Sequence, residues 1–216
     1  MVVTRTERRP PDDVELARLL EHVAVDDAEF RTFLVLAATT GARRAQLLAL
    51  RSRDVDLEAG KVAFRAGLVE GERGPEFTVP KTKRSTCVDL DVRTMQLAAY
   101  HAGRPLPNGC PECFVFSHDG DATTVWKPNW VTKRFLAYQR AIGVGPFRLH
   151  DLRHFMATQM LDLDVAVTVV ARRLGHQRVS TTLDYYSHVV TGRDRQAAER
   201  FAGLLEPRRH DGSRRR

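Results

Sequence analysis

The sequence predicts an α+β fold that is mainly helical and carries a small three-stranded antiparallel β-sheet. Apolar residues recur at helical spacing along most of the chain, whereas three short extended runs lie between residues 61 and 90. The chain has 216 residues, 43% hydrophobic and 28% charged, which is the balance of a folded globular protein. We expect one domain at 12–206, between a flexible lead at 1–11 and a basic disordered tail at 207–216.

Three helices are expected before the sheet. Asp12 and Glu15 form a capping-box pattern, which predicts a helix at about 13–24. A second helix follows and ends at Gly41, because glycine favours the left-handed conformation that closes helices. A third short helix is expected at 43–50.

The predicted sheet contains the extended runs at 61–65, 76–80 and 86–90. Alternation of apolar and polar residues in the last run is typical of a strand with one buried face. The segment from Lys81 to Ser85 is polar and basic, and we expect it to form the turn between the last two strands.

The second half of the chain is expected to be helical. Pro128 suits the first turn of a helix and Gly143 suits the end of the same helix. Phe114–Phe116 is the one strand-like segment within a glycine- and proline-rich loop. The expected helices lie at 92–102, 128–142, 150–162, 164–174, 178–187 and 192–205.

Composition limits the compartment and the partners. No run approaches the roughly 18 apolar residues of a membrane span, and the N-terminus has no apolar core of the signal-peptide kind. We therefore expect a cytoplasmic protein without a membrane partner. The net charge of +7 and the pI near 9.8 favour a polyanionic partner, although part of the excess lies in the two tails.

The three cysteines do not indicate a disulfide framework, because their number is odd and no secretory signal precedes them. Cys110 and Cys113 have the spacing of zinc ligands. A second ligand pair is missing from the sequence, so a loop is preferred to a zinc site.

Three motifs in the second half carry groups that suit phosphate chemistry. His150 and Arg153 are three residues apart and share a helix face, where they can meet one anion. His176 follows a glycine that ends a helix, and two adjacent tyrosines lie close behind it. A phenol can attack phosphorus once its proton is removed. The alternatives are a polar helix face for His150 and Arg153, a loop position for His176 and a packing role for the tyrosines.

These motifs, with two from the first half, resemble the tyrosine recombinases of the phage-integrase family in order and approximate spacing. The resemblance spans about residues 12–190. The matching segments are Thr40-Gly41-Ala42-Arg43-Arg44, Pro80-Lys81-Thr82-Lys83, His150-x-x-Arg153, Leu174-Gly175-His176 and Tyr186-Ser187-His188.

The resemblance implies an integrase-like catalytic domain that cleaves and rejoins double-stranded DNA without metal or cofactor. Arg43 and Arg153 would bind the nonbridging oxygens of the scissile phosphate. Lys81 would protonate the departing 5′ oxygen, His150 would act in proton transfer to or from the nucleophile, and His176 would hydrogen-bond the phosphate. Assembly as a homotetramer on paired DNA sites is implied by the resemblance alone.

The nucleophile is expected to be Tyr186, which would hold the DNA as a 3′-phosphotyrosyl intermediate. Its position before Ser187-His188 follows the family pattern, whereas counting from Thr182 would select Tyr185. Two further basic residues, Lys83 and Arg84, flank Lys81 and compete with it for the phosphate contact.

The chain departs from the family pattern in three ways. Gln46 occupies a position where the family usually carries an acid that orients the first arginine, and Thr86-Cys87 replaces a frequent arginine. A helical core-binding domain is expected before residue 12 and is not in this sequence, as in an excised catalytic domain or a naturally short protein. The alternatives are a catalytically silent DNA-binding module and a type IB topoisomerase.

Overall fold

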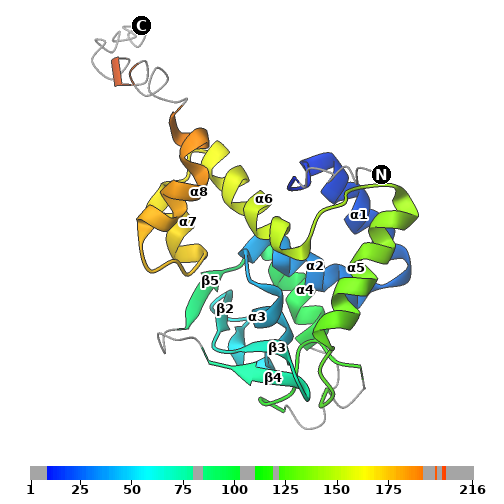
Figure 1. The fold of residues 1–216 in the computed structure, drawn as a ribbon. Helices are drawn as coiled ribbons and strands as arrows, with labels where there is room; N and C mark the ends of the chain where they lie inside the picture. Colours follow the sequence, from blue (N-terminus) through cyan, green and yellow to red (C-terminus); the bar gives the residue numbers. More distant parts are fainter. Residues whose placement is uncertain are drawn as a thin grey trace, which may run out of the picture.

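The computed structural model describes residues 9–79, 85–102, 110–118, 122–191, 198 and 201–202. The predicted fold class is confirmed, because helices dominate and the strands form small antiparallel sheets (Figure 1). The helices are α1 (Asp13–Asp26), α2 (Ala28–Thr40), α3 (Arg44–Leu48), α4 (Val92–Ala102), α5 (Pro128–Ile142), α6 (Leu149–Asp162), α7 (Val167–Arg173) and α8 (Val179–Thr191). The strands are β1 (Val55–Asp56), β2 (Lys61–Phe64), β3 (Gly67–Gly71), β4 (Gly74–Thr78) and β5 (Thr86–Asp89), and a short 3-10 helix, η1, spans Ser52–Asp54.

The capping box predicted at the first helix is present. The Asp12 side chain accepts a hydrogen bond from the Glu15 amide at 2.8 Å, and the Glu15 carboxylate accepts one from the Asp12 amide at 3.1 Å. These two bonds satisfy amide groups that the first turn of a helix leaves without partners. Helix α1 therefore begins where the pattern placed it, and it continues two residues beyond the predicted end.

Helix α2 lies at the centre of the molecule. It contacts α1, α3, α4 and α6, and its side chains are buried on most of its surface (Figure 1). The helix ends at Gly41, whose φ of 67° is left-handed, as predicted. The positive φ favours glycine at this position, and a Cβ atom on Gly41 would lie 2.2 Å from the terminal methyl of Met156 on α6, which would have to move.

Strand pairing differs from the prediction. The three-stranded sheet has the order β1-β2-β5, in which Val62 lies opposite both Val55 and Val88. The predicted middle strand, β4, pairs instead with β3 in a separate two-stranded sheet. Strands β3 and β4 are joined by a tight turn at residues 72–73, which is shorter than the connection from β4 to β5. Because a short loop costs less entropy to close, β4 pairs with β3.

Helices α6, α7 and α8 form a second hydrophobic cluster beside the main core. The main core joins α1, α2, α3, α5, β2, β3 and β5. The second cluster contains Met156, Ala157, Leu161, Val170, Leu174 and Tyr186. Figure 1 shows α7 and α8 at one end of the molecule, next to β5. Helix α7 begins three residues later than predicted, and most of the predicted helix at 192–205 lies outside the described residues.

Two expectations about loops and termini have different outcomes. Cys110 and Cys113, expected to lie in a loop without a disulfide framework, form one disulfide that the cysteine count did not predict. The two residues are close enough in sequence for their chain to turn back on itself, which a cysteine count cannot reveal. The tail at 207–216 and residues 1–8 of the lead lie outside the described residues. No described helix is long and apolar enough to cross a membrane.

Candidate active site

Arg153 connects three parts of the site from the first half of α6. Its side chain is buried, with 5% exposed, and donates from Nη1 to the Gly41 carbonyl at 2.7 Å and from Nη2 to the Leu174 carbonyl at 2.6 Å. Nη2 also lies 3.0 Å from Nε2 of His176. Of the five guanidinium N–H groups, the Nε–H and one Nη1–H have no partner among the described residues. These two donors remain available for an anion.

Arg43 supplies a second positive charge from the start of α3. Its side chain is exposed and makes no hydrogen bond or ion pair with the described residues. Burial, and then the charge of Arg43, lower the pKa of Arg153 to about 10, so the Arg153 guanidinium is charged at neutral pH. Two neighbouring cations that have no acidic partner within the described part of the chain are suited to bind an anion.

Gln46 has a structural role that differs from the family-based expectation. Its side-chain oxygen accepts a hydrogen bond from the Arg43 backbone amide at 2.9 Å, which caps α3. The Gln46 side chain therefore fixes the backbone from which Arg43 extends. A carboxylate is not required for that contact, because an amide oxygen is also a hydrogen-bond acceptor.

His176 is held by the end of α7 and by α8. Its amide donates to the Ala171 carbonyl at 2.9 Å and the Gly175 amide donates to Arg172 at 3.0 Å, which is the Schellman arrangement. Because Arg153 can only donate, Nε2 of His176 accepts, and the Nδ1–H donates to Oγ1 of Thr182 at 2.8 Å. Burial and the charges of Arg153 and Arg43 lower the pKa of His176 to about 4.

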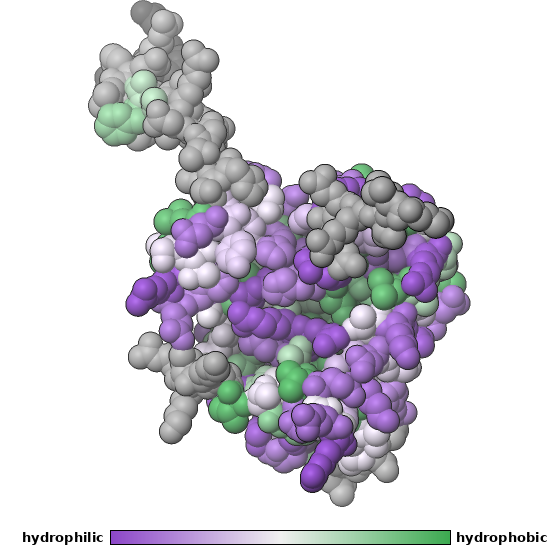
Figure 2. Space-filling model, in the orientation of Figure 1, coloured by the Kyte–Doolittle hydropathy of each residue, from purple (hydrophilic) through white to green (hydrophobic). Residues whose placement is uncertain are grey.

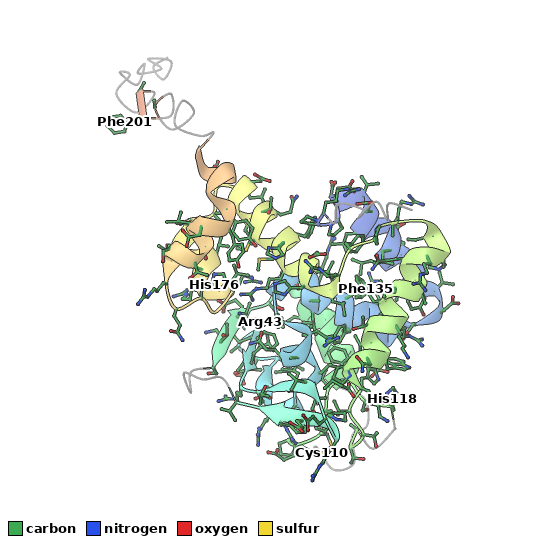
Figure 3. The ribbon with its side chains drawn as sticks, in the orientation of Figure 1. Arg43, Cys110, His118, Phe135, His176 and Phe201 are labelled. Atoms are coloured by element: carbon green, nitrogen blue, oxygen red, sulfur yellow. A yellow bond between two sulfur atoms is a disulfide. The ribbon has the colours of Figure 1, made fainter. Side chains whose placement is uncertain are left out.

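Arg43 and His176 come from opposite halves of the chain and face the same region. Figure 3 shows both between the α7–α8 pair and the strands. Figure 2 shows hydrophilic side chains across the middle of this face, with apolar side chains in the hollow beside them. A groove of about 790 Å³ extends from His176 along β5 to Ser85, four residues after Lys81.

Tyr186 is the buried member of the tyrosine pair. Its side chain is 5% exposed and packs in the second hydrophobic cluster, whereas Tyr185 is 64% exposed. The Tyr186 backbone (φ −122°, ψ 17°) leaves helical geometry and kinks α8. Its hydroxyl oxygen lies 2.8 Å from Nδ1 of His154. Burial raises the pKa of Tyr186 to about 12, although Arg153 opposes this shift.

His154 is the functional candidate that motif reading missed. It follows Arg153 directly and lies one helical turn after His150, and the centroids of the two imidazole rings are 5.0 Å apart. His150 itself makes no hydrogen bond to Tyr186 among the described residues. The available signal was the four-residue spacing, which places both imidazoles on one face of α6.

His150 and Arg43 lie on the other side of the site. Both line a cavity of about 530 Å³, whose walls include Phe135, Phe147 and Leu149. Burial, His154, Arg153 and Arg43 lower the pKa of His150, while Asp151 opposes them. The imidazole of His150 is therefore mainly neutral at physiological pH.

The structure brings Arg43, His150, Arg153, His176 and Tyr186 into one region, because each either contacts another member of the set or perturbs its pKa. Lys81 and its neighbours Lys83 and Arg84 lie outside the described residues. Among the residues that are described, no group of three or more His, Cys, Asp or Glu side chains is arranged to hold a metal ion.

Comparison with known proteins gives a consistent family match. The family model described as "Phage integrase family" matches residues 12–193. The chain is 28% identical over 192 residues to tyrosine recombinase XerA of Pyrococcus furiosus, covering 89% of this chain and 61% of that protein. It is 24% identical over 199 residues to the ICEBs1 integrase of Bacillus subtilis, covering 88% and 53%. The chain thus spans about half the length of several curated relatives that it matches.

Solved structures show the same fold. The Tn1549 transposon integrase in complex with circular intermediate DNA superimposes with a TM-score of 0.78 at 18% identity, covering 93% of this chain and 69% of the other. The catalytic domain of bacteriophage HP1 integrase superimposes with a TM-score of 0.61 at 16% identity. That match covers 94% of this chain and 99% of the HP1 domain, so the two share a common extent.

Proposed function

The chain belongs to the phage integrase family, and on that premise we propose that it is the catalytic part of a site-specific DNA recombinase. It would cleave and rejoin double-stranded DNA through a 3′-phosphotyrosyl intermediate. The observation that carries this proposal is the arrangement of Arg153: three of its N–H groups are held by protein, and two remain beside Arg43 for an anion. A scissile phosphate fits that arrangement.

The two arginines would stabilise the charge that develops on the phosphate. Arg153 is held by the Gly41 and Leu174 carbonyls, so its free N–H groups point in a fixed direction before substrate binds. Because these donors are already oriented, little reorganisation of the protein is needed during the reaction. Arg43 is exposed and can approach the same phosphate from the DNA side.

Tyr186 would attack phosphorus and displace the 5′ oxygen. The phenol loses its proton as the bond to phosphorus forms, and the departing 5′ oxygen receives a proton, a role that we assign to Lys81. The tyrosyl phosphodiester keeps the energy of the broken bond. A 5′ hydroxyl of another strand can therefore reverse the step and complete joining without nucleotide hydrolysis.

The remaining assignments belong to the same proposal. Residues 12–206 would form the catalytic domain, working as a homotetramer on paired DNA sites in the cytoplasm. His150 would act beside Arg43, whose charge perturbs its pKa, and His176 would hydrogen-bond the phosphate. For His176 to donate, its Nε2 must gain a proton, and the negative charge of the bound phosphodiester would favour that change.

A trapped covalent adduct tests the proposal. The chain is incubated with a library of nicked duplexes in which cleavage releases a short 5′ strand, so that religation is prevented, and denaturation-resistant complexes are recovered and sequenced. We expect an adduct that is lost in Tyr186→Phe and kept in Tyr185→Phe. The Tyr185 variant is a matched control, because Tyr185 is its exposed neighbour.

The other outcomes are also informative. An adduct that persists in Tyr186→Phe would contradict the choice of nucleophile. If the wild-type chain binds duplexes but forms no adduct, a catalytically silent DNA-binding module is supported instead. Binding should weaken steeply with salt, because phosphate contacts release counterions.

A further inference from the structure

We propose that His154 positions the hydroxyl of Tyr186 and accepts its proton during DNA cleavage. This inference rests on the proposed function, because it takes Tyr186 as the nucleophile. The hydroxyl oxygen of Tyr186 lies 2.8 Å from Nδ1 of His154, which is within reach for direct proton transfer. Among the described residues, His154 is the hydrogen-bond partner of this hydroxyl.

The Tyr186 ring is immobilised, which makes this contact specific. The ring packs with Met156, Leu161 and Leu174 in the second hydrophobic cluster, and 5% of the residue is exposed. Helices α6 and α8 contact each other where the two side chains meet. The apolar part of the side chain is thus fixed by packing, and the orientation of the hydroxyl is fixed by the imidazole.

His154 is surrounded by groups that keep it neutral overall. Burial is the largest influence on the pKa of His154 and lowers it. The charges of Arg153 and Arg148 lower this pKa further, whereas Asp151 raises it. Tyr185 and Tyr186 face the ring from α8, and His150 packs against it from α6. A neutral imidazole with its proton on Nε2 leaves a lone pair on Nδ1, which a proton acceptor requires.

The proposed cleavage step transfers two protons, one at the tyrosine oxygen and one at the 5′ oxygen. The O–H bond of Tyr186 breaks as the bond between its oxygen and phosphorus forms, and the proton moves to Nδ1 of His154. The bond between phosphorus and the 5′ oxygen breaks, and that oxygen takes a proton from a different group, Lys81 in the proposed function. In the joining step a 5′ hydroxyl attacks phosphorus and gives its proton back to Lys81. The bond between phosphorus and the tyrosine oxygen breaks, and His154 returns its proton to that oxygen.

The two histidines on α6 have different contacts, which indicates different roles. His154 contacts the nucleophile, whereas His150 lines the cavity that also includes Arg43. From the family resemblance, His150 was expected to exchange the proton with Tyr186. We assign it to His154 because, within the described part of the chain, it is His154 whose ring nitrogen reaches the phenol.

The first test needs no DNA. Nitrogen NMR of the histidine rings in the full chain should show Nδ1 of His154 without a proton and hydrogen-bonded, and Tyr186→Phe should shift that resonance. A signal for a proton carried on Nδ1 of His154 would overturn the assignment, because the imidazole would then be the donor to the phenol. This result is independent of whether the chain cleaves DNA.

The second test separates proton transfer from positioning. His154→Asn keeps a polar atom near the position of Nδ1 but cannot act as a base at neutral pH, and His154→Phe removes both properties. We expect cleavage by His154→Asn to be about 100-fold to 10,000-fold slower, with DNA binding retained. The defect should decrease as pH rises, because solvent hydroxide can then remove the proton.

A substrate with sulfur in place of the bridging 5′ oxygen identifies which proton is affected. A thiolate leaves without protonation, so this substrate should rescue Lys81→Ala and should not rescue His154→Asn. Rescue of His154→Asn, or a normal rate with the ordinary substrate, would contradict the inference while the wild-type adduct upholds the proposed function. A wild-type chain that forms no adduct would instead contradict the proposed function, and the NMR result would still decide the contact.

Discussion

The guanidinium of Arg153 and the imidazole of His176 share a hydrogen bond of 3.0 Å between Nη2 and Nε2. Since a guanidinium has no acceptor, this bond determines that Nε2 of His176 is unprotonated. The proton of the neutral ring is therefore on Nδ1, which donates a hydrogen bond to Oγ1 of Thr182. A contact between α6 and the end of α7 therefore sets the tautomer of a candidate phosphate ligand.

The two arginines of the site should differ sharply in their effect on stability. Arg153→Ala leaves the buried Gly41 and Leu174 carbonyls without their donor, and each loss costs about 1–3 kcal/mol. We expect a destabilisation of about 2–6 kcal/mol by chemical denaturation. Arg43→Ala is the matched control, because the exposed Arg43 side chain has no hydrogen-bond partner among the described residues. It should change stability by less than about 0.5 kcal/mol.

Both arginine variants should lose DNA cleavage, since both guanidinium groups face the proposed phosphate. Equal stability changes in the two variants would contradict the structural distinction between them. Retained cleavage in Arg43→Ala would contradict its role in binding phosphate. Comparing denaturation with adduct formation thus separates folding from chemistry.

A side chain at Gly41 should destabilise the fold. Its φ is 67°, and a Cβ atom would lie 2.2 Å from the Met156 side chain. We expect Gly41→Ala to destabilise the chain by at least about 1 kcal/mol from backbone strain alone, and to shift the carbonyl that holds Arg153. Gly143→Ala is the control, since Gly143 also has a positive φ, of 68°, but its Cβ would meet nothing within 4 Å among the described residues. A smaller loss in Gly41→Ala than in Gly143→Ala would contradict the close approach.

Local patterns predicted the helices well because their determinants lie within a few residues. The capping box at Asp12 and the stop at Gly41 are set by neighbouring backbone groups, and both are present. Strand pairing was predicted less well, because β5 pairs with β2 across more than twenty residues, and nothing local specifies that choice. The disulfide of Cys110 and Cys113 was missed for a similar reason, since it depends on loop geometry.

Motif order selected the candidate residues of the site, whereas their hydrogen-bond partners became known only from contacts between distant helices. The sequence names Arg153, His176 and Tyr186 as candidates, but it contains no sign that the hydroxyl of Tyr186 reaches His154. That contact depends on the packing of α6 against α8 and on the kink at Tyr186. The role of Gln46 as a cap was likewise visible only from the backbone geometry of α3.

Acid should destabilise the chain partly through His176. The pKa of His176 in the folded chain is lowered to about 4, from an ordinary value of 6.5, chiefly by burial. Between these two values the unfolded chain binds more protons, so stability rises with pH in that window. The contribution of His176 is fully present above about pH 6.5 and is lost as pH falls towards 4.

Denaturation measured from pH 7 to pH 4 checks this effect. His176→Gln, which cannot titrate, should reduce the fall in stability across the window, and NMR titration of the ring should give a midpoint well below 6.5. A midpoint at the ordinary value would show that His176 is not enclosed by Arg153 and Thr182 as described. His154 and His150 also have lowered pKa values, so some slope should remain in the variant.

Thr182 should act on the reaction through His176. Its side chain is fully buried and its Oγ1 receives the Nδ1–H of His176 at 2.8 Å, so it holds the ring with Nε2 facing Arg153. Thr182→Val keeps the volume but removes the acceptor, which leaves the Nδ1–H unpaired and costs about 1–3 kcal/mol. We expect slower cleavage in Thr182→Val, by about tenfold or more, because the ring can then rotate or change tautomer. Thr182→Ser keeps the hydroxyl and should keep most of the rate, although it loses a buried methyl group. If Thr182→Ser is as slow as Thr182→Val, loss of packing and not loss of the hydrogen bond explains the slower cleavage. The positioning role would be contradicted if Thr182→Val kept the wild-type rate and nitrogen NMR showed an unchanged His176 tautomer.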